Sequence, residues 1–111
     1  MKKVIKYWNS DLNEIREIIK KEIKELKSRR KEIFLEIHEN QMRYPLEMIR
    51  NLYSEDREIE KKIIDLEVKE VEEIISWIEE GDYERDSDGY LHFKYSQKLR
   101  YLKEVQEGLS E

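Results

Sequence analysis

Apolar side chains recur every three or four residues through most of the chain, and this spacing restricts the fold more than any other feature. On a helix it places them along one side, so we expect long helices that each bury one stripe. The first stripe lies on a helix predicted over 10–42 and comprises Leu12, Ile15, Ile19, Ile23, Leu26, Ile33 and Ile37. The second lies on a helix predicted over 45–80 and comprises Leu46, Ile49, Tyr53, Ile59, Ile63, Leu66, Ile74 and Ile78.

A single proline separates the two stripes. Pro45 suits the first turn of a helix but not its interior, because its ring removes a backbone N–H and clashes with the preceding turn. We therefore predict a turn at Arg43 and Tyr44, which joins the two helices into a long antiparallel hairpin. The polar run 51–55 leaves two readings open: the second helix is broken near Ser54, or it continues.

Two other segments have the character of strands. Residues 3–8 are rich in β-branched and aromatic side chains, which predicts a short strand. Within 83–95, Asp88 and Gly89 form a strong two-residue turn signal, and a β-hairpin is predicted there. Apolar residues alternate along its second strand, as on one face of a sheet: Leu91, Phe93 and Tyr95.

These elements predict one domain over 1–111 with a mainly α (α+β) fold. It consists of the helical hairpin, a small β-hairpin or sheet, and a short C-terminal helix over 97–108 that begins after Ser96. A helical hairpin covers only one side of each helix, and the small elements are too short to cover the rest. We therefore expect a second copy to complete the packing in a homodimer.

The residue content argues against several classes of function. The chain has no cysteine, so thiol catalysis and thiolate metal sites are excluded. Its two histidines, No catalytic residue, metal site or cofactor is therefore predicted, and we do not expect an enzyme.

Composition also gives expectations about setting and source. No apolar run approaches the ~18–20 residues that cross a bilayer, and the N-terminal residues lack a signal-peptide pattern, so a cytoplasmic protein without membrane contact is expected. Lysine and glutamate are abundant, which is typical of hyperthermophiles, although an AT-rich genome favours similar residues. An accessory protein of a hyperthermophilic archaeal virus or mobile element fits this composition.

Basic residues follow one side of the first predicted helix: Arg16, Lys20, Lys24, Lys27 and Lys31. Like charges at this spacing repel unless a partner neutralises them. That partner is the acidic second helix around 65–73, an acidic protein, or nucleic acid. A net charge of −5 argues against strong binding to nucleic acid. A nucleic-acid-binding regulator of winged-helix type, with 83–95 as its wing, is the alternative function, although four carboxylates in that segment would repel phosphates.

Two further features complete the predictions. Trp8, Tyr90 and His92 would face outward together on the predicted sheet and form a patch for a protein partner. Arg30 occupies a position on the first apolar stripe, so it either extends to solvent or forms half of a specific ion pair. The sequence thus favours a non-enzymatic, homo-oligomeric interaction or adaptor protein.

Overall fold

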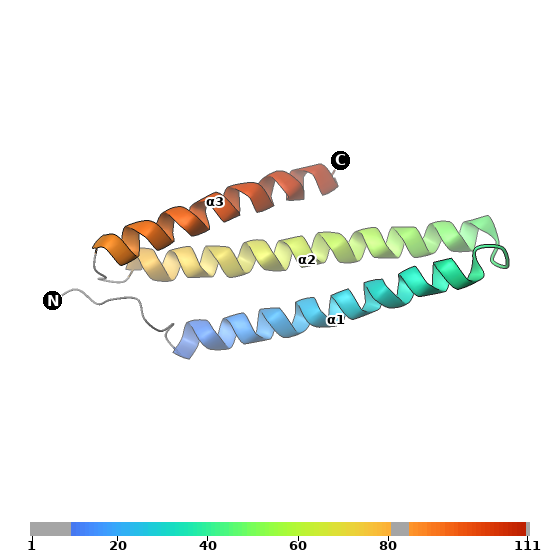
Figure 1. Ribbon diagram of the computed structural model, residues 1–111, viewed down its shortest axis with the longest axis horizontal. Helices are drawn as coiled ribbons and strands as arrows, with labels where there is room; N and C mark the ends of the chain where they lie inside the picture. Colours follow the sequence, from blue (N-terminus) through green and yellow to red (C-terminus); the bar gives the residue numbers. More distant parts are fainter. Residues whose placement is uncertain (1–9, 81–84, 111) are drawn as a thin grey trace.

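The computed structural model describes residues 10–80 and 85–110, which form three α-helices: α1 (Ser10–Asn40), α2 (Leu46–Glu80) and α3 (Arg85–Ser110). α1 and α2 form an antiparallel hairpin, and α3 returns along the opposite side of α2 (Figure 1). α2 packs against both neighbours, whereas no Cα of α1 lies within 8 Å of a Cα of α3 in these residues. The helices therefore form one layer with α2 in the middle.

The turn of the hairpin lies where the sequence predicts it. At the end of α1, the side-chain amide of Asn40 donates to the Glu36 carbonyl at 2.9 Å. The Asn40 carbonyl accepts the N–H groups of Arg43 and Tyr44 at 3.0 and 2.9 Å, which tightens the turn. The Pro45 carbonyl then accepts two N–H groups from the first turn of α2 at 3.0 and 3.2 Å. These bonds satisfy backbone groups that helix ends leave without intrahelical partners.

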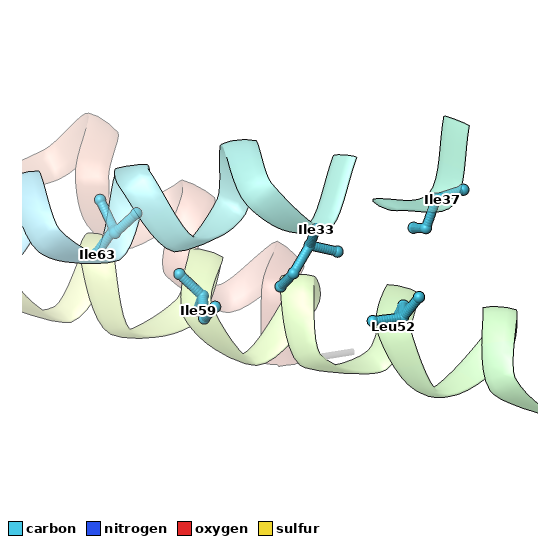
Figure 2. Packing of buried hydrophobic residues seen from close by; sticks show 5 residues of the cluster. All are labelled: Ile33, Ile37, Leu52, Ile59 and Ile63. Atoms are coloured by element: carbon cyan, nitrogen blue, oxygen red, sulfur yellow. The ribbon is translucent and has the colours of Figure 1, made fainter. Parts of the chain in front are cut away.

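The two predicted apolar stripes meet along the seam between α1 and α2. Ile33 and Ile37 of α1 point toward α2 and pack with its buried residues in one cluster (Figure 2), the α2 members being Leu52, Ile59 and Ile63. α2 is continuous through Ser54, which resolves the open question of a break near 51–55. The reason is visible in the cluster, because buried residues on both sides of Ser54 hold the helix against α1.

Two adjacent arginines of α1 clamp α2 through carboxylates one residue apart. Arg30 donates to Asp56 from Nε at 2.8 Å and from Nη2 at 3.3 Å. Arg29 donates to Glu55 from the same two nitrogens at 2.9 and 3.0 Å. The hydrogen bond from Arg29 lowers the pKa of Glu55. Arg30 is therefore half of a specific ion pair, one of the two readings that its position on the stripe allowed.

α3 packs against a second apolar side of α2. Leu102 of α3 forms a buried cluster with Val68 and Val71 of α2, and half-buried side chains extend it to Tyr95 and Leu99. A polar contact lies further along, where the amide nitrogen of Gln106 donates to Asp65 at 2.6 Å. α3 therefore supplies the cover for α2 that we had expected only from a second copy.

The predicted β-hairpin over 83–95 is wrong, because residues 85–95 form the first part of α3. The described residues contain helices and no strand, so the α+β class is corrected to an all-helical arrangement over those residues. Tyr95 belongs with Leu99 and Leu102 at helical spacing, and burial of this stripe on α2 outweighs a local turn signal. Helical Gly89 costs only about 1 kcal/mol relative to alanine. The strand predicted over 3–8 lies outside the described residues.

The molecule is elongated, and one end of the hairpin extends beyond α3. Its principal extents are 66 × 27 × 15 Å and its radius of gyration is 18.7 Å, against about 13 Å for a compact chain of similar length. α3 stops beside the middle of α2 (Figure 1), where Arg57 donates to the Leu109 carbonyl at 3.5 Å. The helices on the turn side of this point pack only against each other in the described residues. We call residues 34–53 the hairpin end.

Candidate functional site

The predicted basic residues of α1 lie beside an open groove of about 650 Å³ that all three helices line. Lysines of α1 form one side, and Lys98 of α3 lies on the other. Glu67 and Glu70 of α2, the central helix, lie between them. We call this feature the lysine groove, and its four α1 members are Lys20, Lys24, Lys27 and Lys31.

Ion pairing inside the molecule neutralises only part of this basic surface. The guanidinium Nε of Arg16 lies 3.9 Å from a carboxylate oxygen of Glu70, and both side chains are largely buried. Lys20 lies 3.9 Å from Glu17 of its own helix. In the described part of the chain, no carboxylate lies within 4.0 Å of the other groove lysines, which are Lys24, Lys27, Lys31 and Lys98. The acidic second helix therefore accounts directly for Arg16 and leaves most of the stripe facing outward.

Sequence reasoning missed Lys98. This lysine precedes Leu99, which packs toward α2, and so it lies at the edge of the buried side of α3. Nothing in its local sequence distinguishes it from the exposed Lys103 on the same helix. Its place in the groove follows only from the path that α3 takes along α2.

A second surface, at the hairpin end, is apolar. Nine large hydrophobic side chains are exposed among the described residues, and six belong to residues 34–53: Phe34, Leu35, Met42, Leu46, Met48 and Tyr53. Phe34 is 68% exposed and Tyr53 is 56% exposed, although both are large aromatics. They line a hollow of about 520 Å³ together with Ile33 and Ile37. The surface collects where α3 no longer covers the hairpin.

The patch predicted from Trp8, Tyr90 and His92 is not brought together in the predicted way. Trp8 lies outside the described residues, and Tyr90 lies in α3 with its side chain outside the described part. On a helix, side chains two residues apart point in nearly opposite directions, unlike on a strand. His92 instead ties α3 to α2, with its Nε2 2.9 Å from a carboxylate oxygen of Glu79.

Other classes of site were sought in the same residues. Across 10–80 and 85–110, no group of three or more His, Cys, Asp or Glu side chains could hold a metal ion. No helix in these ranges is long and apolar enough to cross a membrane. No protein-family model, curated protein or solved structure matches the chain. The lysine groove and the hairpin end are therefore the two surfaces from which function is argued.

Proposed function

We propose that this chain is a non-enzymatic interaction protein that works as a homodimer joined through the hairpin end. The observation that supports this proposal is the gathering of exposed apolar side chains where α3 stops. Contiguous apolar surface is costly in water, and on a folded protein it marks a place of protein contact. Phe34 and Tyr53, which line one hollow, are the central residues of the proposed interface.

A second copy suits this surface for two reasons. Each hairpin end offers a pair of helices with uncovered sides, so two ends packed together would form a four-helix bundle. Exposed charges of both signs surround the apolar residues, namely Glu39, Arg43, Glu47 and Arg50. Under two-fold symmetry the same patch meets itself, and a patch with both signs can place unlike charges opposite each other.

Light scattering across ~1 to 100 µM, a range in which a dimer of micromolar Kd forms, tests the proposal. We expect the mass to rise from that of one chain, 13.8 kDa, toward twice that value. The double variant Phe34→Ser, Tyr53→Ser should remain a monomer and keep its helical circular dichroism, because both residues are exposed and removing them opens no core cavity.

The matched control replaces two equally exposed aromatics of α3, in the double variant Phe93→Ser, Tyr101→Ser. It should dimerise like the unchanged chain, since neither residue belongs to the hairpin end. A single-chain mass throughout the range would contradict the homodimer. Equal loss of dimer in both double variants would place the contact elsewhere.

The alternative function, a nucleic-acid-binding regulator, has lost the wing on which its winged-helix form depended, because 85–95 is helical. The lysine groove is the feature that still supports it. Binding of duplex DNA at that groove is therefore treated below as one outcome of an experiment.

A further inference from the structure

We propose that the lysine groove binds an acidic helix from a partner protein, aligned along α1. The groove is lined by α1, α2 and α3, whereas the hairpin end lies beyond α3. This inference therefore goes beyond homodimerisation, and either proposal can fail without the other.

The arrangement of the helices leaves a place for a fourth. α1 and α3 both pack on α2 but do not contact each other in the described residues, so the groove runs between them over α2. A helix laid there would touch all three and complete a four-helix bundle. Half-buried Ile23 and the aliphatic parts of the lysine side chains offer apolar contact along the way.

The spacing of the lysines matches a helical ligand. Lys20, Lys24, Lys27 and Lys31 follow one another at steps of four, three and four residues, and extend over about 16 Å of α1. Glutamates at the same steps on a neighbouring helix keep this register, as charged residues beside a coiled-coil seam do. Lys98 on the opposite wall could contact the other edge of the same helix.

The charges of α2 favour a peptide over nucleic acid. Glu67 and Glu70 lie among the lysines, so a ligand that is anionic all round would meet carboxylates as well as amines. A phosphate backbone carries closely spaced charge and cannot avoid them. A helix can carry its acids on the two edges that face α1 and α3, and present uncharged residues to α2. The groove thus fits a helix with acidic edges and an uncharged middle.

The test uses a labelled synthetic helix of about 18 residues, or ~27 Å, that carries glutamates at steps of four, three and four. Fluorescence anisotropy measures its binding, and a second peptide with glutamine at these positions provides the neutral comparison. We expect the acidic peptide to bind and the glutamine peptide to bind at least about tenfold more weakly. The affinity should fall as salt rises from ~50 to 200 mM, because these charges are exposed.

Two protein variants then locate the binding. Lys24→Glu with Lys27→Glu reverses two groove lysines, and we expect affinity to fall by about tenfold or more, since each lost attraction becomes a repulsion. The matched control, Lys62→Glu with Lys103→Glu, makes the same change in net charge at exposed lysines outside the groove. It should bind nearly as well as the unchanged chain. Circular dichroism checks that both variants keep their helices.

Three results would overturn the inference. One is equal binding of the acidic and glutamine peptides, which would show that charge does not select the ligand. Another is equal loss of affinity in the groove and control variants, which would show that net charge acts without the groove. The third is tighter binding of a DNA duplex than of the peptide, lost in the groove variant alone, which would assign the groove to nucleic acid.

Discussion

Arg30 shows how one residue can satisfy two demands at the seam between α1 and α2. It occupies a position where the stripe predicts an apolar side chain, and its guanidinium meets Asp56 through two hydrogen bonds. Such paired contacts fix geometry as well as charge. The neighbouring Arg29–Glu55 pair bridges the same helices, so the register of α1 against α2 is held at two adjacent points.

Removing the carboxylate in Asp56→Ala leaves a half-buried guanidinium without its main partner, and we expect a loss of stability of about 1 kcal/mol. Urea unfolding followed by circular dichroism measures it. Asp56→Asn retains one acceptor oxygen and should lose less. The control Glu58→Ala breaks a pair within one helix turn, with Lys61 at 3.4 Å, and should cost about 0.5 kcal/mol or less. Equal costs for Asp56→Ala and Glu58→Ala would show that the seam pair adds nothing.

At the scale of elements, α3 is where local and tertiary preferences conflict. Asp88 and Gly89 form a turn signal, and three alternating apolar residues follow it, yet the segment is helical. The same residues also belong to a stripe at helical spacing, with Leu99 and Leu102 further along. α2 has an apolar side that needs cover, and a long α3 supplies it.

The substitution Gly89→Ala distinguishes the two local structures. In a helix alanine is favoured over glycine, so we expect thermal and urea unfolding to show a gain of about 0.5–1 kcal/mol. In a type I′ turn this position requires positive φ, and alanine would destabilise. Gly108→Ala provides the scale for helix propensity near an end, because an added Cβ there meets nothing within 4 Å. Loss of stability at Gly89 together with a gain at Gly108 would contradict a helix through 89.

At the scale of the whole molecule, the elongated layer depends on one junction where all three helices meet. Ile74 and Ile78 of α2 are fully buried there with Leu12 of α1, and half-buried Tyr95 of α3 packs against them. The opposite end of the molecule has no contribution from α3 within the described residues. We therefore expect damage at the junction to affect all three helices.

Ile74→Ala should lower the free energy of unfolding by about 2–5 kcal/mol, the range for emptying a core site. Ile18→Ala makes the same change on α1 at a side chain that is 54% exposed, against 0% for Ile74, and should cost under about 1 kcal/mol. Circular dichroism during urea unfolding gives both values. Similar costs for the two substitutions would show that the junction does not hold the layer together.

Much of the hairpin could be predicted from residue order. The steps of three and four between apolar residues predict two long helices, and Pro45 places the turn. The same periodicity puts Lys20, Lys24, Lys27 and Lys31 on one side of α1. The lysine groove was half predicted in this way. Phe34 was missed because it lies beside the stripe, where the sequence does not show whether a neighbour covers it.

By itself the sequence determined that the chain forms a helical hairpin, which side of each hairpin helix is apolar, and where that hairpin turns, because these depend on contacts between residues three or four apart. Tertiary structure alone decided that 85–95 is helical, that Lys98 faces the α1 lysines, and that the hairpin end is left uncovered. A stripe states that one side of a helix needs cover. Which helix provides that cover, and how far along it extends, depends on packing between residues distant in the chain.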